Sequence, residues 1–198
     1  MLLSDPTSFT PALDETAVLM AYARGDQGAA AVLTAQIGPR VLGFATRMLG
    51  GDRAEAEDVT QEVMLRLWKA AKTWDADGAA KPSTWAFRVA SNLCIDRQRK
   101  RKRVTPGLDD APEPADPTPS GEDRLHAAAR VEALDQALAT LPDRQREAVI
   151  LRHIEGWSNP EISGHLDISV EAVESLTARG KRALAKVLAP RRKELGHG

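Results

Sequence analysis

The sequence predicts an all-α protein made of two small helical domains joined by a linker. The chain has 198 residues, a length that suits two small domains. Hydrophobic residues make up 42% of it and aromatic residues only 4%, so the apolar supply is mostly Ala, Leu and Val. Such side chains favour closely packed helices over β-sandwiches. Apolar residues recur at helical spacing on both sides of one proline-rich stretch, which divides the chain.

The N-terminal helices are expected from this spacing and from the breakers between them. Two helices are predicted between Asp14 and Met48, with Gly25-Asp26 and Gly38-Pro39 as the interruptions. A long helix from about Ala54 to Thr73 follows the break at Gly50-Gly51-Asp52.

A further N-terminal helix is predicted after the loop from Asp75 to Lys81. Pro82 fits the first turn of a helix, where its missing N–H costs nothing, so this helix runs from about Ser83 into a basic block. The basic block consists of Arg97, Arg99, Lys100, Arg101, Lys102 and Arg103.

The proline-rich stretch from Thr105 to Gly121 is the predicted linker. Its five prolines and scarce apolar side chains cannot repay the entropy of ordering, and the prolines keep it semi-extended. The predicted domains are residues 1–103 and 122–198, with residues 104–121 as a flexible acidic linker. Its acidic residues are Asp109, Asp110, Glu113 and Asp116.

The C-terminal domain is predicted to contain a helix-turn-helix. Amphipathic helices run from Asp123 to Leu141 and from Pro142 to about Glu155. Ser158-Asn159-Pro160-Glu161 has the form of a capping box and starts a short helix ending near His165. After a tight turn, Ser169 can cap a last helix that extends to about Leu188. The apolar residues expected to join the last two helices are Ile162, Leu166, Ile168 and Val173.

The charge of the chain is unevenly distributed. A formal net charge of -1 gives no overall basic signal and, taken alone, argues against a nucleic-acid partner. The basic block and the acidic linker nevertheless occupy separate segments. The near-zero net charge therefore hides one strongly positive and one strongly negative segment.

Three runs of sequence carry a family resemblance. Residues 56–68, AEDVTQEVMLRLW, and residues 83–97, STWAFRVASNLCIDR, lie before the linker. Residues 141–173 follow it and contain LPDRQRE, LR, EGWS, EI and ISVEAV in this order. The first two runs resemble regions 2.2 and 2.3–2.4 of the extracytoplasmic-function (ECF) sigma factors of bacteria, and the third resembles their region 4. Many response regulators carry a similar third run, so the first two decide the assignment.

The resemblance implies a sigma factor that directs core RNA polymerase to promoters and initiates transcription, in a stress response under the control of an anti-sigma factor. The N-terminal domain would grip the polymerase clamp and melt the −10 element. The C-terminal domain would read the −35 element and meet the polymerase flap, and the linker would thread the polymerase interior.

The helix from Ala54 to Thr73 is predicted to carry the polymerase-binding face. Leu65 lies among polar residues opposite the apolar stripe of this helix, and an aliphatic anchor with a polar rim is typical of a partner-binding face. The alternative is an ordinary solvated face. The resemblance places the clamp contact here too, and the predicted polymerase-binding residues are Asp58, Gln61, Glu62, Met64 and Leu65.

Aromatic and cationic residues between Trp74 and Arg103 favour binding of single-stranded DNA, although Trp85 and Phe87 could instead belong to the core. The amide of Asn92 can read the edge of a flipped base, and the resemblance gives it that role. The basic block would neutralise phosphates, with a nuclear-localisation tract as the alternative. The predicted −10 DNA-binding residues are Trp74, Lys81, Ser83, Arg88, Asn92, Arg97, Arg99, Lys100, Arg101 and Arg103.

The outer face of the last helix is predicted to enter the major groove. Arg179 is the candidate for bidentate guanine contact, and Ser175 can bond a base or a phosphate. Glu174 departs from the family, in which many relatives carry a basic residue. The predicted −35 DNA-binding residues are Glu171, Glu174, Ser175, Ala178, Arg179 and Arg182.

Catalysis is not expected. The four histidines lack metal-ligand spacing, and Cys94, which has no evident His partner, is expected to be buried and inert. We therefore predict no cofactor and no metal. The main alternative function is a helix-turn-helix regulator that binds operators without polymerase, but it would need a sensing domain before residue 104, and none is visible. Without a signal peptide or a stretch of about 18 apolar residues, a cytoplasmic protein with no membrane insertion is expected.

Overall fold

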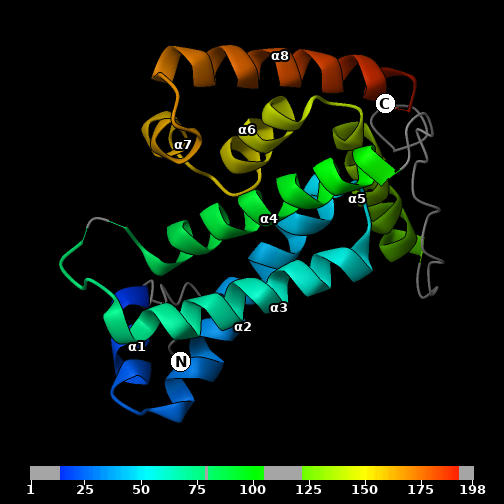
Figure 1. The fold of residues 1–198 in the computed structure, drawn as a ribbon. Coiled ribbons are helices and arrows are strands. Elements are labelled where there is room, and N and C mark those ends of the chain that lie inside the picture. Colours follow the sequence, from blue (N-terminus) through cyan, green and yellow to red (C-terminus); the bar gives the residue numbers. More distant parts are fainter. Residues whose placement is uncertain (1–13, 79, 105–121, 192–198) are drawn as a thin grey trace, which may run out of the picture.

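The computed structural model describes residues 14–78, 80–104 and 122–191, and within them the regular structure is entirely helical (Figure 1). The N-terminal domain consists of α1 (Glu15–Ala23), α2 (Gln27–Met48), α3 (Arg53–Ala70) and α4 (Pro82–Val104). The C-terminal domain consists of α5 (Glu122–Ala139), α6 (Asp143–His153), α7 (Asn159–Leu166) and α8 (Val170–Leu188). The predicted linker lies outside the described residues. None of the helices described is long and apolar enough to cross a membrane.

Five of the described helices begin at a short polar side chain that caps them. Asp14, Asp26 and Asp52 precede α1, α2 and α3, and each accepts a hydrogen bond from a backbone N–H of the first turn. The predicted capping box of α7 is present, because Ser158 N donates to Glu161 Oε2 at 2.8 Å while the Ser158 side chain accepts from Glu161 N. The side chain of Ser169 caps α8, as predicted.

The predicted interruption at Gly38-Pro39 is wrong, because α2 continues through Pro39. A proline inside a helix removes one backbone hydrogen bond. Here the burial of Leu33, Ile37 and Val41 on one face of α2 outweighs that loss, since all three are at most 1% exposed. Gly38, which has no Cβ, also reduces the clash that a proline makes with the residue before it.

Two helical layers face each other across α4. In Figure 1, α1, α2 and α3 lie below α4, and α6, α7 and α8 lie above it. Phe87 of α4 meets Phe44 of α2 edge to face, with ring centroids 5.3 Å apart, so the N-terminal core closes on one side of α4. The C-terminal domain packs over the other side and leaves α8 outermost.

Candidate polymerase and nucleic-acid interfaces

The exposed face of α3 carries most of the predicted polymerase-binding residues. Asp58 and Gln61 are exposed, and Leu65 is 55% exposed, the largest fraction among the exposed large apolar side chains of the described residues. Glu62 is half-buried and accepts a hydrogen bond from Arg66 Nε at 2.7 Å. These side chains form the polar rim around an aliphatic centre that the sequence predicts.

Met64 does not belong to this face. Its side chain is only 7% exposed and lies in the core. On α3, Met64 lies three residues before Leu67, so it widens the buried stripe instead of joining Leu65 on the outer side. Met64 is therefore not available to a partner that binds the exposed face of α3.

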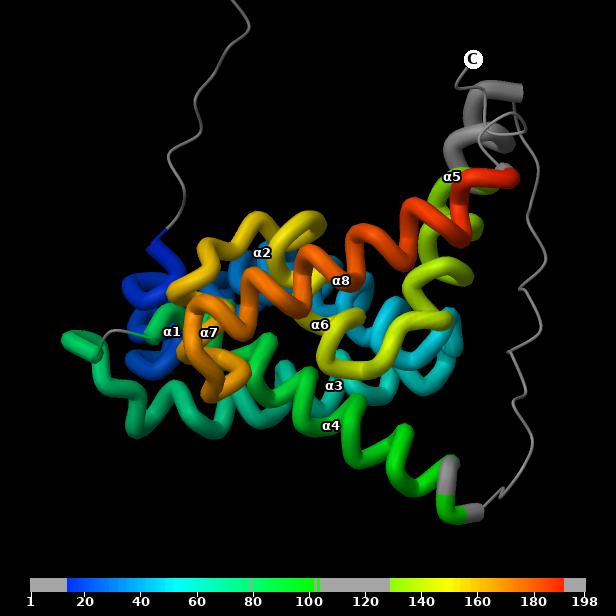
Figure 2. The backbone as a smooth tube through the Cα atoms, turned by 90° about the horizontal axis from the view of Figure 1, so that it is seen from above, coloured from blue at the N-terminus to red at the C-terminus, as the bar shows by residue number. Residues whose placement is uncertain are grey.

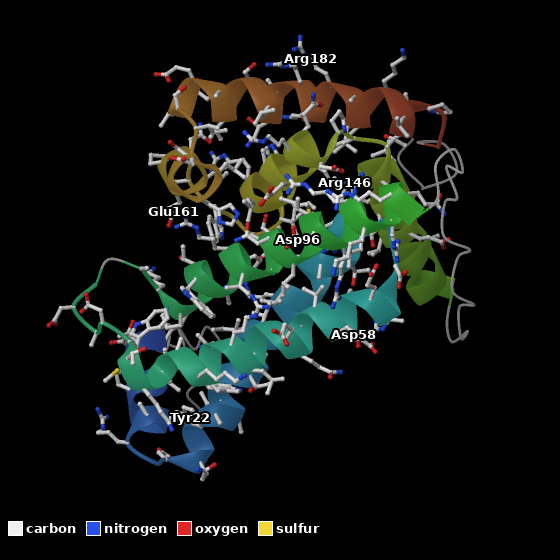
Figure 3. All side chains as sticks on the ribbon, viewed as in Figure 1. Tyr22, Asp58, Asp96, Arg146, Glu161 and Arg182 are labelled. Atoms are coloured by element: carbon white, nitrogen blue, oxygen red, sulfur yellow. The ribbon has the colours of Figure 1, made fainter. Side chains whose placement is uncertain are left out.

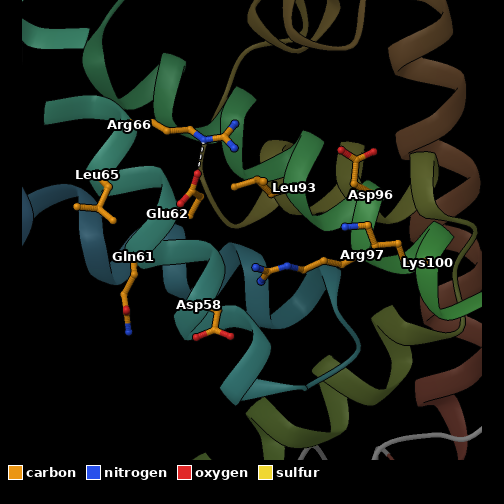
Figure 4. Close-up of a pocket in the computed structure, with 9 residues that line it drawn as sticks. All are labelled: Asp58, Gln61, Glu62, Leu65, Arg66, Leu93, Asp96, Arg97 and Lys100. Carbon is orange, nitrogen blue, oxygen red and sulfur yellow. Dashed lines mark hydrogen bonds and ion pairs between the residues drawn. The ribbon is translucent and has the colours of Figure 1, made fainter. Parts of the chain in front are cut away.

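The outer face of α3 forms one wall of a groove, and α4 forms the other (Figure 4). The groove has a volume of about 490 Å³ and mixes carboxylates, cations and two leucines. It is lined by Asp58, Gln61, Glu62, Leu65, Arg66, Leu93, Asp96, Arg97 and Lys100. Sequence reasoning missed Leu93 and Asp96. Their spacing places them on one face of α4, but only the packing of α4 on α3 turns that face toward Leu65.

The basic block at the end of α4 divides into two groups. Arg97 Nη1 donates to the carbonyl oxygen of Glu55 at 2.7 Å, and Arg101 forms ion pairs with Asp52 and Glu55. A backbone hydrogen bond from Glu55, together with Arg101, holds the pKa of Asp52 below its usual value. These two arginines, predicted to contact DNA, are engaged in fastening α4 to the start of α3.

The remaining cations of the basic block point outward. Arg99, Lys100 and Arg103 are exposed. The end of α4 extends beyond the packed helices (Figure 2). The side chain of Lys102 lies outside the described residues. In the described part of the block, these three side chains are therefore the cations best placed for the predicted contact with phosphates.

An aromatic pocket lies where the 3₁₀ turn Ala71–Thr73 and the following loop meet α4. Trp74 and Trp85 line it with their rings 6.1 Å apart at 79°, and its volume is about 400 Å³. Trp85 and Phe87 were the two aromatic residues that could instead belong to the core. Phe87 does belong to it, because its side chain is fully buried.

Ser83 is placed differently from the prediction. Its side chain is 7% exposed, and its backbone N–H donates to Glu15 Oε2 of α1 at 2.8 Å. The first turn of a helix leaves N–H groups without intrahelical partners, and a carboxylate there is favourable. Ser83 thus takes part in the tertiary capping of α4 by α1.

Asn92 is exposed on the same face of α4 as the aromatic pocket but does not line it. It follows Trp85 by seven residues, about two helical turns, and Arg88 lies exposed between them. Together with the exposed Lys81 before the helix, they form a strip of one aromatic, one amide and two cationic side chains.

The outer face of α8 is open, as predicted. Glu171, Ala178, Arg179 and Arg182 are exposed, and Arg182 points away from the body of the molecule (Figure 3). Ser175 is half-buried, and its Oγ accepts a hydrogen bond from Arg179 Nη2 at 2.6 Å, so the two proposed base-reading residues are bonded to each other.

Two further contacts fix α8. Exposed Glu174 accepts a 3.4 Å hydrogen bond from Asn159 Nδ2 of α7. This bond engages the carboxylate that departs from the basic residue expected at this position. On the inner side, Gly180 lies so close to α6 that an added Cβ would be 2.5 Å from Val149 Cγ2.

Cys94 is fully buried, and burial raises the pKa of its thiol to about 12. The thiolate, which is the reactive form, is therefore absent at neutral pH. This agrees with the prediction of a buried and inert cysteine.

Comparisons with known proteins match both halves of the chain. The family model Sigma-70 region 2 matches residues 33–104, and the model Sigma-70, region 4 matches residues 131–184. Among solved structures, CnrH in complex with the cytosolic domain of CnrY superposes with a TM-score of 0.64 at 28% sequence identity, over 89% of this chain and 98% of that one.

Curated relatives give the same assignment. The ECF RNA polymerase sigma factor SigW of Bacillus subtilis is 32% identical over 174 residues, which cover 83% of this chain and 91% of SigW. The RNA polymerase sigma factor NccH of Alcaligenes xylosoxydans xylosoxydans is 31% identical over 183 residues, which cover 90% of this chain and 96% of NccH. The chain therefore belongs to the ECF family of RNA polymerase sigma factors.

Proposed function

We propose that this chain binds core RNA polymerase and directs it to promoters as an ECF-type sigma subunit, with one interface for each step. The observation that carries the proposal is the order of the two sigma-region matches along the chain, each coinciding with an exposed surface of suitable chemistry. Residues 1–103 would act as the polymerase- and −10-binding domain, residues 104–121 as the linker and residues 122–198 as the −35-binding domain. Its action is positional rather than catalytic, and it takes place in the cytoplasm with the polymerase.

The α3–α4 groove suits the polymerase clamp. Leu65 and Leu93 offer apolar contacts, while Asp58, Glu62 and Arg66 provide charges of both signs for a partner helix. An anti-sigma factor would compete for the same groove, and family membership makes this the expected form of control.

The strip on α4 suits an opened −10 element. The Trp74–Trp85 pocket provides faces against which a base can stack, and Asn92 offers a donor and an acceptor for a base edge. Arg99, Lys100 and Arg103 would hold phosphates whether or not the duplex is open.

The outer face of α8 suits the major groove of the −35 element. Arg179 would leave Ser175 for the O6 and N7 atoms of guanine, while Glu174 would accept from cytosine or be kept clear of phosphates by Asn159.

Transcription in vitro over a library of promoters tests the proposal. The full chain with core polymerase should select promoters that share −35 and −10 elements, and the chain alone should bind them weakly. Tight, sequence-specific binding without polymerase would contradict the proposal and favour the operator-binding regulator.

A further inference from the structure

We propose that Asp75 makes the aromatic pocket selective for an extruded base that carries an exocyclic amino group, cytosine or adenine, over one that carries a keto oxygen in its place, thymine or guanine. The inference rests on the proposed function, because it concerns the base that is read at the −10 element. Asp75 directly follows Trp74 and is not among the −10 residues predicted from the sequence.

Most of the pocket offers a base no hydrogen bond from a side chain. Ala70, Gly78 and Ala80 line it without a polar side-chain atom. Trp74 and Trp85 are half-buried, and Trp74 Nε1 is enclosed by the protein, so the ring of Trp74 presents carbon atoms to a ligand. These walls suit stacking, which tolerates any base, and they leave selectivity to the remaining residues.

The remaining lining residues are Thr73 and Asp75. Thr73 Oγ1 donates to the carbonyl oxygen of Ala70 at 3.4 Å, so its proton is already engaged. Asp75 Oδ1 accepts from the backbone N–H of Asp77 at 3.2 Å, a bond that builds the turn after Trp74. Among the described residues none donates to Asp75 Oδ2, so this oxygen is the acceptor that the pocket holds ready for a ligand.

Gly78 keeps Asp75 Oδ2 open. A Cβ at position 78 would lie 3.2 Å from Oδ2 and 3.2 Å from the backbone oxygen of Asp75, tighter than ordinary van der Waals contact. The turn itself needs only Oδ1, so a role in the turn accounts for one half of the carboxylate. The lack of a side chain at Gly78 leaves the other half accessible.

A carboxylate beside promoter DNA needs a donor to face it. Asp75 and Asp77 are both exposed, and their charges repel the phosphates that the cations of α4 attract. A carboxylate accepts hydrogen bonds and, when ionised, donates none. Its partner in the pocket must therefore bring an N–H group.

The exocyclic amino group of a base is such a donor. Cytosine N4 and adenine N6 donate, whereas thymine O4 and guanine O6 are acceptors that a carboxylate repels. The same amino group is paired inside the duplex, so the contact becomes available only when the base is extruded. Selectivity at this pocket would therefore contribute to promoter opening. Asn92 does not line the pocket, so its contact with DNA is a separate one.

Asp75→Asn is the variant that separates this contact from the turn. The amide keeps one oxygen to accept from Asp77 N and replaces Oδ2 by a donor, so the preferred base should change from the amino to the keto type. Asp77→Asn is the matched control, because it removes an equal charge two residues away and Asp77 does not line the pocket.

Heparin-resistant open complexes measure the preference. The full-length chain and core polymerase would be mixed with promoters that carry each of the four bases at each −10 position of the non-template strand. Two further templates would replace cytosine by 2-pyrimidinone and adenine by purine, which lack only the amino group. These templates test the wild type directly, without any substitution in the protein.

At one −10 position the wild type should form about tenfold more open complexes with cytosine or adenine than with a keto base or with the matching amino-free base. Asp75→Asn should reverse the order of amino and keto bases at that position alone, and Asp77→Asn should behave as the wild type does. A wild type that is indifferent to the amino group would overturn the assignment. So would an unchanged preference in Asp75→Asn or an equal shift in Asp77→Asn.

Failure of the proposed function gives a different result. If the chain does not serve as a sigma subunit, no template forms open complexes with the wild type or with either variant. If only the role of Asp75 is wrong, open complexes still form, and their base preference does not depend on residue 75.

Discussion

At the scale of single residues, Leu65 and Met64 show how neighbouring positions on α3 separate an exposed face from the core. The two are neighbours in sequence, yet Leu65 is 55% exposed and Met64 only 7% exposed. The exposed leucine is among the residues that line the α3–α4 groove, as is Gln61. An exposed apolar side chain at the centre of a polar face buries little area on folding, so we expect Leu65 to act in binding rather than in stability.

Replacing Leu65 and Gln61 together by Ala should weaken core-polymerase binding by about 2–4 kcal/mol with almost no change in thermal stability. Met64→Ala is the contrasting variant and should lower the free energy of unfolding by about 2–5 kcal/mol. Titration of labelled polymerase and thermal denaturation distinguish the two. Equal destabilisation by both changes would make Leu65 a structural residue.

Replacing Asn92 should affect promoter opening, whereas replacing the outward cations of α4 should affect promoter binding. Flipping a base costs a few kcal/mol, which contacts available only to the extruded base must offset. Asn92→Ala should therefore leave closed complexes nearly intact, reduce open complexes and relax discrimination at one −10 position. Permanganate footprinting checks this, and normal melting of every −10 variant would place the base-reading group elsewhere.

Changing Arg99, Lys100 and Arg103 to Ala should instead weaken binding to all promoters alike and flatten its salt dependence, because each cation neutralises a phosphate. Arg101 is a poor choice for this experiment, since its ion pairs with Asp52 and Glu55 hold α4 in place. A salt titration gives the result, and a sequence-dependent loss would contradict the phosphate assignment.

At the scale of elements, the junction of α3 and α4 contains a carboxylate whose charge stabilises the fold. Asp52 caps α3 and pairs with Arg101, and its pKa is lowered in the folded chain. A lowered pKa contributes stability above the unfolded value near 3.8, and this stability is lost as the pH falls through the folded pKa.

Asp52→Asn keeps a capping side chain but removes this charge. The variant should be less stable than the wild type at pH 6, and the difference should shrink below about pH 4. Thermal melting between pH 6 and 2 measures it. A constant difference over this range would show that the charge of Asp52 adds nothing.

The contact of α8 with α6 sets a second requirement at this scale. Because a Cβ at position 180 would overlap Val149, Gly180→Ala should destabilise the C-terminal domain by about 1–3 kcal/mol and reduce −35 binding with it. Gly164→Ala in α7 is the matched control, since its Cβ would meet nothing within 4 Å. Denaturant unfolding of both variants provides the comparison.

The elements themselves were largely predictable, since caps and helical spacing are local signals. The Ser158 capping box and the end of α8 at Leu188 agree with expectation. The continuation of α2 through Pro39 was not predicted, because the burial of α2 depends on helices that are distant in sequence. For the same reason the sequence could suggest the outer face of α3 but not its pairing with Leu93, nor the docking of Trp157 on Phe87.

At the scale of the whole molecule, the linker is acidic, whereas the segment of the N-terminal domain just before it is basic. Reversing Asp109, Asp110, Glu113 and Asp116 to Lys should impair initiation more than promoter binding, because an acidic segment can occupy a basic channel made for nucleic acid. Abortive and full-length transcripts, measured beside binding, test this. Normal initiation with the reversed charges would reduce the linker to a tether.

The hydrogen bond from Ser83 to Glu15 makes the start of α4 depend on α1. Glu15, on α1, precedes the segment matched by the region 2 family model, yet it binds the first turn of the helix that carries Asn92. Leu19 of α1 is also fully buried, and the ring of Tyr22 packs at a tilt against that of Trp68 with centroids 4.7 Å apart, so α1 is part of the same folded unit. We therefore expect substitutions in α1 to change how firmly the first turn of α4 is held, and with it the ease of promoter melting, while the residues predicted to contact bases stay the same.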